Sequence, residues 1–487
     1  MSKVSQSKLE SAISRVGARD VFTLFVFLWG AAALFRVLGP SGAAVGIFVY
    51  PTVLGLTQIL LAIGSLWLLI RPGDSLPLIL VAIIGPIVAW QEAPILGNHW
   101  LLVTFVDIAI LLSALIALRD GRINRKRLAE IFLPIARWCL VLFYPFAAFA
   151  KLNSAFFDTT VSCSTYYLDE TARSLGFSAP PTVGMGGMVQ ALPALTVITE
   201  FSIPILLSCR RTRIAGVGLG LAFHSLIALD RIHLFIDFSS VLAAMFILFL
   251  PARFATCTLR FLKGRGRQLL IFWISIAGLI LVAQWIGRGG LAFFVFSEGR
   301  LFIWYVFDLA ILLGVAFWLV RHRWQTLERP FAFGGKGSVW LAMVPALLVL
   351  NGLLPYFELR TAYVYTMYSN LSMVAGKSNH FIVRSSFPLS SRQTDLVKLV
   401  ASSDPGLSAY ATENYLLPWD SFRTYLAKHP QEAVIYERGG KRYLVDRASD
   451  YPELITPPSL LTQKFFALRA VDGSDKARCQ DVFLPAL

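Results

Sequence analysis

Long apolar runs separated by short polar stretches dominate the first 354 residues. A helix needs about 20 predominantly apolar residues to cross a bilayer. Eleven runs approach or exceed that length, at roughly 21–39, 46–70, 76–94, 99–118, 131–150, 191–208, 214–230, 233–251, 268–287, 301–320 and 338–354. The pattern therefore predicts an all-α polytopic membrane bundle of about eleven transmembrane helices.

Basic residues gather in every second loop between these runs. They lie around Arg15 and Arg19, at Arg71, and in the stretches 119–127, 210–213, 253–267 and 321–329. The alternate loops, 40–45, 95–98, 151–190, 231–232 and 288–300, carry few positive charges. Because cytoplasmic loops are the ones enriched in Lys and Arg, we predict an integral cell or inner membrane protein with a cytoplasmic N-terminus and an external C-terminus.

The chain becomes polar beyond the last apolar run, which divides it into a transmembrane domain, 1–354, and a small external α+β domain, 355–487. Residues 433–445 alternate around Gly439-Gly440 and predict a β-hairpin. Residues 418–428 predict a short helix that ends before Pro430. Phe465 to Val471 predicts a further strand.

Composition supports the membrane assignment and argues against nucleic acid as a partner. The chain of 487 residues is 56% hydrophobic and 15% charged, whereas soluble domains are about 45–50% apolar and about 25% charged. The mean hydropathy is +0.64. Although the net charge is +15, the basic residues lie in short loops rather than along one binding stripe. The lipid bilayer is the predicted partner.

The spacing of the cysteines and the absence of common catalytic motifs argue against several classes of metal site and enzyme. The five cysteines show no C-x-x-C spacing and the histidines show no H-E-x-x-H, so we predict no metal site. There is no G-x-S-x-G, P-loop or dinucleotide motif. Cys163 and Cys479 both fall on the predicted external side, where they either pair as a disulfide or remain two thiols.

Two ionisable residues at membrane depth are the first candidates for chemistry, because such residues are costly in lipid and mark functional sites. Lys151 ends the fifth apolar run, and His224 lies inside the seventh. Lys151 is either an interfacial lysine that snorkels to the headgroups or a desolvated base. His224 is either bonded to a neighbouring carbonyl or hydroxyl, or it donates to a substrate oxygen or relays a proton.

Further polar residues fall at the same predicted membrane face or within the spans. Asn98-His99 precedes the fourth span, and Ser378-Asn379-His380 follows the last one. The topology brings His99, Lys151 and His380 to one face. Asp107, Glu200, Asp237 and Asp308 lie at membrane depth. Structural pairing suits Asp107 and Asp308, whereas Glu200 follows the long external loop that begins at Lys151.

Several motifs occur together in one order. They are Asn98-His99, Ala148-Phe-Ala-Lys-Leu-Asn153, Glu200 with Pro204 and Arg210-Arg-Thr-Arg213, Phe223-His224, Phe238-Ser239, Leu350-Asn-Gly-Leu-Leu-Pro-Tyr356, Met367-Tyr-Ser-Asn-Leu371 and Ser378-Asn-His380. Over about residues 95–385 this order resembles the HTTM (horizontally transferred transmembrane) family, the bacterial relatives of vitamin K-dependent gamma-glutamyl carboxylase. Phe156 stands where that family usually has tryptophan, and the external tail is much shorter than that of the animal enzyme.

The resemblance implies a chemistry and a set of site residues. In the carboxylase the matching lysine deprotonates reduced vitamin K, and oxygenation of the quinol then drives removal of a glutamate γ-proton before CO₂ addition. By resemblance, Lys151, His224 and His380 would be catalytic, and Asn98, His99, Asn153 and Glu200 would bind a reduced naphthoquinone. The expected partners are a lipid-soluble quinone and a peptide or protein substrate on the external face.

Two other functions remain open at this point. A non-enzymatic accessory or maturation factor could use the same scaffold, which the short tail and Phe156 favour. A transporter is permitted by the acids at membrane depth, but it predicts inverted repeats with broken helices, and we find no convincing pair in the sequence.

Overall fold

A computed structural model describes residues 3–37, 53–231, 233, 235–265, 268, 271, 272, 275, 291–321, 331, 339–366 and 368–479 of the chain. The described part is mostly helical, with a small sheet near the C-terminus. The apolar helices are α1 (Lys3–Val37), α3 (Val53–Ile70), α4 (Ser75–Glu92), α5 (Asn98–Ala117), α6 (Arg125–Ala150), α9 (Leu192–Ser208), α10 (Arg213–Ile227), α11 (Ile236–Ile247), α14 (Leu291–Arg321) and α15 (Met343–Leu353).

The helices confirm a mostly helical fold with several candidate membrane spans, but they do not confirm the predicted count of about eleven. Among the described residues, seven helices are long and apolar enough to cross a membrane, or eight if the bent pair α11 and α12 (Ala252–Lys263) is one span. Two further apolar helices, Gly55–Ile70 and α10, are shorter than that length. The predicted span 268–287 lies almost entirely outside the described residues.

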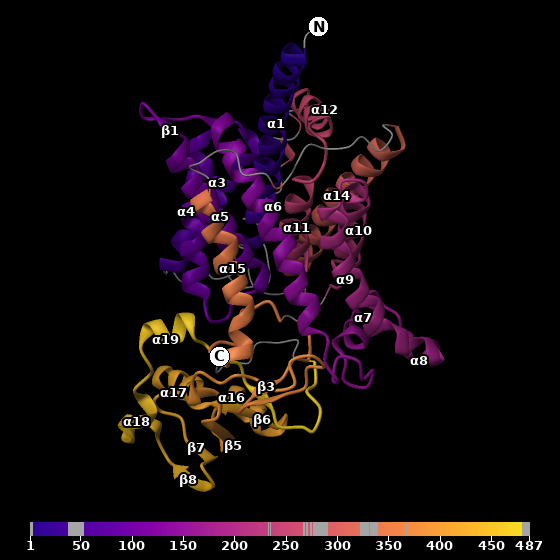
Figure 1. Ribbon diagram of the computed structural model, residues 1–487. Helices are drawn as coiled ribbons and strands as arrows, with labels where there is room; N and C mark the ends of the chain where they lie inside the picture. Colours follow the sequence, from indigo (N-terminus) through magenta and orange to yellow (C-terminus); the bar gives the residue numbers. More distant parts are fainter. Residues whose placement is uncertain are drawn as a thin grey trace.

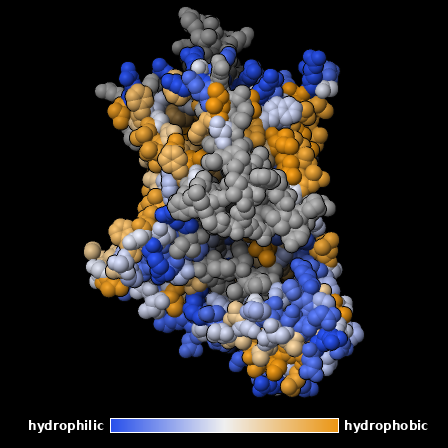
Figure 2. Space-filling model, turned by 180° about the vertical axis from the view of Figure 1, so that it is seen from behind, coloured by the Kyte–Doolittle hydropathy of each residue, from blue (hydrophilic) through white to orange (hydrophobic). Residues whose placement is uncertain are grey.

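The helical part and the C-terminal domain lie one above the other (Figure 1). The N-terminus, the short hairpin of β1 (Leu118–Arg119) and β2 (Arg122–Ile123), and α12 lie at the end of the bundle away from the C-terminal sheet. Apolar side chains follow the flanks of the helical part, and hydrophilic ones gather at its N-terminal end and over the C-terminal domain (Figure 2). Where they fall within the described residues, the loops predicted to be cytoplasmic and external thus lie at opposite ends of the bundle.

The stretch 253–267, predicted as a loop, begins as a helix. After α11 the chain turns by 120° into α12. Phe254 and Ala255 are the buried residues of α12, and Arg260 and Lys263 lie in its last turn. Such a sequence forms an amphipathic helix, in which one face packs against the protein and the other stays polar. The prediction of a loop was wrong because a short amphipathic helix contains no long apolar run.

The C-terminal domain is an antiparallel sheet covered by short helices. Its strand order is β8-β7-β5-β6-β9. The strands are β5 (Leu396–Ser402), β6 (Tyr415–Pro418), β7 (Val434–Arg438), β8 (Lys441–Val445) and β9 (Val471–Asp472), with helices α16 (Pro405–Thr412), α17 (Trp419–Lys428), α18 (Pro452–Ile455) and α19 (Leu460–Phe465). A second hairpin, β3 (Met373–Val374) with β4 (Lys377–Ser378), precedes the sheet. The α+β prediction is confirmed.

Local signals in this domain gave mixed results. The hairpin is confirmed as β7 and β8, with Gly439 and Gly440 both at positive φ, where a side chain would be strained. The helix at 418–428 is confirmed as α17. The strand predicted over residues 465–471 is largely wrong, because Phe465 ends α19 and only Val471 enters a strand. The sheet has its own hydrophobic core, which begins at Val397.

Candidate functional site

Helix α6 delivers Lys151 to the end of the bundle that faces the C-terminal domain. The helix begins at an N-cap, Asn124, whose side chain accepts from the backbone N–H of Arg127. It ends at Lys151, whose own N–H donates to the carbonyl of Ala148 at 3.1 Å. A cation at a helix C-terminus is favoured by the exposed carbonyl dipoles. The local sequence therefore fixes where the lysine emerges.

Lys151 forms a buried ion pair with Glu200 of α9. Lys151 Nζ lies 3.0 Å from Glu200 Oε2, and the two side chains are 6% and 11% exposed. Lys151 Nζ also donates to the carbonyl of Ala147 at 3.3 Å. Taking both charges out of water is expensive unless they remain together. The snorkelling interpretation of Lys151 is therefore not what the structure displays: its amine points to a carboxylate rather than to solvent.

His224 of α10 shares a hydrogen bond with Tyr144 of α6. The Tyr144 hydroxyl and His224 Nε2 are 2.6 Å apart, and both residues are buried. Ser239 of α11 donates to the backbone carbonyl of His224 at 2.8 Å. Among the described residues, His224 Nδ1 has no hydrogen-bond partner. In the tautomer in which Tyr144 donates to Nε2, the Nδ1–H is available to a ligand oxygen.

Both pairs line one cavity of about 280 Å³. This size is near the lower end of small-molecule pockets, which run from about 300 to 1,000 Å³. Asn98, Tyr144, Lys151, Glu200 and His224 are among the residues that supply polar groups to its wall. Aromatic rings supply much of the remaining wall: Phe143, Tyr167, Phe223, Phe235, Phe238, Tyr365 and Tyr368. A largely apolar cavity with a few converging polar groups suits a flat, neutral ring that carries oxygen atoms.

His99 lies behind this cavity rather than on its wall. Its Nε2 is 3.1 Å from Asp237 Oδ2, and the neighbouring Trp100 donates its indole N–H to the same oxygen at 3.0 Å. The ring of Phe238 stands between the two histidines, 5.1 Å from that of His99 and 4.8 Å from that of His224. His99 is thus a neighbour of the site that orients Phe238, not a group that reaches the cavity.

Asn153 and His380 tie the end of α6 to the C-terminal region instead of lining the cavity. The two residues pair as an isolated antiparallel bridge. His380 Nε2–H donates to the carbonyl of Phe149 at 2.8 Å, while its Nδ1 accepts from the backbone N–H groups of Ile382 and Val383, each at 3.1 Å. With one nitrogen donating and the other accepting, the ring is neutral. Burial lowers the pKa of His380 below its ordinary value of 6.5, against the opposing effect of the Phe149 carbonyl.

Residues 369–380, which we call the strap, continue this connection through several asparagines. A disulfide outside the strap adds to it. Asn153 donates to the carbonyl of Ser369 at 2.6 Å, and Asn379 donates to that of Asn370 at 2.8 Å. Asn370 accepts from the backbone N–H of Cys163 at 2.9 Å. Cys163 and Cys479 form a disulfide with a sulfur–sulfur distance of 2.08 Å. Of the two alternatives, pairing is the one found, and the strap holds the segment after Lys151 in place.

The remaining acids take structural positions. Asp107 accepts a hydrogen bond at 2.9 Å from the indole N–H of Trp29 and does not line the cavity. Asp237 belongs to the His99 cluster described above, and Asp308 is buried on α14. The structure thus brings together four of the predicted site residues, Asn98, Lys151, Glu200 and His224, and places His99, Asn153 and His380 outside the cavity.

Sequence reasoning missed Tyr144 as a partner of His224. A signal was present, because Tyr144 and Lys151 are seven residues apart on α6 and therefore share one helix face. Tyr167 lies within α7 (Cys163–Ser174), and Phe235 and Tyr368 lie in or next to loops; these three rings gave no such signal. Their approach to the cavity depends on how the external segments fold over the bundle.

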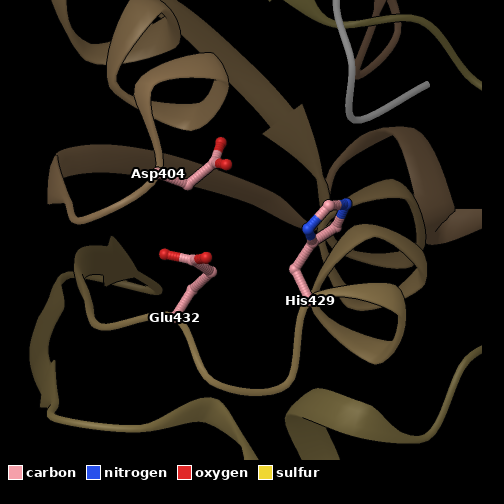
Figure 3. Close-up of side chains that lie close together, drawn as sticks. All are labelled: Asp404, His429 and Glu432. Carbon is pink, nitrogen blue, oxygen red and sulfur yellow. The ribbon is translucent and has the colours of Figure 1, made fainter.

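Sequence reasoning also missed a group of possible metal ligands in the C-terminal domain. Ligand atoms of Asp404, His429 and Glu432 lie within 4.8 Å of one another (Figure 3). Asp404 caps α16 by accepting from the N–H of Leu407 at 2.8 Å, and it also accepts from the Tyr425 hydroxyl. Glu432 accepts from Ser403 at 2.5 Å. These contacts join α16, α17 and the start of β7, and they account for both carboxylates as parts of the fold.

The comparisons with known proteins leave the family open. No protein-family model matches the chain, and neither the curated proteins nor the solved structures contain a match to it. The geometry of the cavity therefore has to carry any functional conclusion by itself.

Proposed function

We propose that this protein is an integral membrane enzyme that deprotonates a lipid-soluble quinol, as its resemblance to the carboxylase family implies. The observation that supports the proposal is the presence of two proton-transfer pairs, Lys151–Glu200 and Tyr144–His224, on the wall of one aromatic cavity. The proposal includes the eleven-span topology with a cytoplasmic N-terminus, which places the cavity near the external face.

Lys151 and Glu200 act as the base. In a cavity that excludes water, the charged pair and its neutral form, an amine beside a carboxylic acid, differ less in free energy than they would in solution. When the proton resides on Glu200, the Lys151 amine accepts the proton of a quinol hydroxyl, and the quinolate that forms balances the resulting ammonium while Glu200 stays neutral. Glu200 consequently holds Lys151 in place and also determines whether the Lys151 amine can accept a proton.

His224 binds the second quinol oxygen. Its Nδ1–H donates to that oxygen, and Tyr144, bonded to Nε2, fixes the tautomer. Asn98 offers a further amide to the ring substituents. The aromatic wall packs against both faces of the ring. Reaction of one quinol with one O₂ to give one quinone epoxide and one water supplies the driving force, and modification of an external peptide, with carboxylation as one form, would be coupled to it.

A non-enzymatic accessory role is the second candidate, and the closed ion pair favours it. If the Lys151–Glu200 pair exists only to stabilise the bundle, its charges need no substrate. The two candidates differ in whether the pair takes part in a reaction. A transporter receives less support, since the broken pair α11 and α12 has no counterpart among the other described spans.

The test is oxygen-dependent epoxidation of a reduced naphthoquinone by purified protein. We expect turnover in the wild type and its loss, by about 10²–10⁴-fold, in Lys151→Ala, because that is the usual contribution of a positioned base. Lys377→Ala, which changes an exposed lysine of β4 near the same end of the bundle, is the matched control and should keep the rate. Absence of turnover in folded wild-type protein with several quinols would overturn the enzymatic proposal in favour of the accessory role.

A further inference from the structure

The external segment between α7 (Cys163–Ser174) and α9 has the composition of membrane-immersed rather than exposed chain. No charged residue occurs from Ser174 to Thr199; the nearest are Arg173 and Glu200. Surface loops are normally rich in charge, and a stretch of this length without any is unusual outside lipid. We call residues 174–191, which contain α8 (Pro181–Gly184) and η1 (Gly186–Ala191), the interfacial segment.

The apolar side chains of this segment point outward. No residue of α8 or η1 is buried, and Phe177, Val183 and Met188 are all exposed. Figure 1 shows α8 projecting sideways from the bundle, near the level at which α9 begins. Several exposed apolar side chains on one short segment are typical of a binding or membrane-contact site. The surface is continuous with α9, since η1 leads directly into that helix.

Polar contacts hold the segment in this position. The hydroxyl and the backbone N–H of Thr182 both donate to the carboxylate of Asp169 in α7, at 2.6 and 3.1 Å. Gln190 donates to the Thr159 hydroxyl at 3.3 Å. The polar groups of the segment thus turn toward the protein, which leaves its apolar side chains for another surface.

The cavity opens next to this segment. Leu226 at the end of α10 lines the cavity and is 62% exposed. Thr171 of α7 and Leu192 and Thr196 of α9 line the same side and are partly exposed. Because α9 and α10 present apolar side chains outward here, the opening faces the surface that lipid would cover.

We propose that the interfacial segment lies in the outer leaflet of the membrane and that the opening beside Leu226 admits a neutral, lipid-soluble aromatic ligand directly from the bilayer. Helices and turns with an apolar outer side and polar inner contacts bind the interface in this way. The membrane contact stands on the composition and exposure of the segment. The class of ligand rests on the proposed function.

Lipid contact can be measured without any activity. In a background that carries Cys209→Ser and Cys257→Ser, Met188→Cys is labelled with a nitrobenzoxadiazole fluorophore and reconstituted into bilayers that contain doxyl-labelled lipids. Leu444→Cys on β8 is the matched control, because Met188 and Leu444 are both apolar and both 68% exposed. We expect strong quenching at position 188 and little at position 444. Equal quenching at the two positions would overturn the membrane contact.

The opening is tested with the same label on Leu226→Cys and added menadione, which quenches fluorophores at short range. We expect saturable quenching at position 226 and a weaker, linear effect at position 444. If doxyl lipids quench position 188 but menadione does not saturate at position 226, the opening beside Leu226 does not admit this class of ligand, the membrane contact stands, and the quinol proposal is decided by the epoxidation assay alone. If the lipids do not quench position 188, the lateral route fails whatever the activity of the enzyme.

Discussion

The cavity and the C-terminal domain each contain an ion pair of a basic side chain with a carboxylate, but in opposite surroundings. Lys151 and Glu200 are 6% and 11% exposed, whereas Arg438 and Asp395 are 34% and 37% exposed. The pair in the domain is geometrically better, with two hydrogen bonds of 2.7 Å. Water nevertheless screens it, so good geometry contributes little there. In the cavity, by contrast, the contact between Lys151 and Glu200 compensates for the loss of water around both charges.

Breaking the cavity pair on one side should give the largest effect in the molecule. Glu200→Gln leaves the Lys151 ammonium buried without a counter-charge, and loss of one partner of a buried pair costs about 3–5 kcal/mol. We expect a matching fall in the free energy of unfolding in detergent, together with loss of quinol turnover. The double variant Lys151→Met with Glu200→Leu should recover most of the stability, because an apolar replacement of a buried pair is often neutral.

The double variant also separates the two candidate functions. Under the enzymatic proposal it is stable and inactive, since the base is gone. Under the accessory role it is stable and keeps whatever biological activity the wild type has. A double variant that is as unstable as Glu200→Gln would show that the pair does not act as a unit, and it would remove the basis of the comparison.

The strap joins the two regions and should respond to pH, with a smaller effect. Because burial places the pKa of His380 below 6.5, the folded protein disfavours its protonated form. The strap is therefore fully stable above the unfolded pKa and loses stability as the pH falls below 6.5, since the unfolded chain binds the proton more readily. We expect faster amide hydrogen exchange at Ile382 and Val383 at pH 5.5 than at pH 7, after correction for intrinsic rates.

The expected acceleration has a local cause. Protonation of Nδ1 removes the acceptor of both amides, so a His380→Ala variant, which has no side-chain acceptor, should exchange quickly at either pH. The amide of Tyr436, inside the sheet at β7, is the reference and should stay protected throughout. Acceleration at Tyr436 equal to that at Ile382 would indicate general unfolding and contradict the local explanation.

Much of the helical architecture could be predicted, because apolar runs report burial or lipid contact residue by residue. The β7–β8 hairpin could be predicted equally well, since Gly439 and Gly440 adopt a positive-φ conformation that few other residues adopt. The predicted count of about eleven spans is not confirmed among the described residues, because run length does not distinguish a full crossing from a short apolar helix such as α10 or a bent one such as α11. An apolar run indicates that its residues are buried or in contact with lipid, but it does not show whether the helix crosses the whole bilayer.

The site was predictable only in part. The predicted topology put Lys151, His99 and His380 at one membrane face. Residues at the same face can still lie far apart across the bundle, and only Lys151 of the three lines the cavity. Its partner Glu200 is distant in sequence, and their contact depends on how α6 packs on α9. The group around His429 was missed for the same reason, because its third member, Asp404, comes from a separate element.

The exposed pair of the domain should give the smallest effect and thereby calibrate the largest. In a double-mutant cycle of Arg438→Gln and Asp395→Asn, we expect a coupling of about 0.2–1 kcal/mol that shrinks as salt is raised, since exposed charges are screened. The same cycle on Lys151 and Glu200 should give a coupling several times larger with little dependence on salt. Both cycles are measured by unfolding of the full chain in the same detergent. If the two couplings were equal, burial of Lys151 and Glu200 would not set their energetics, and the cavity would be open to water.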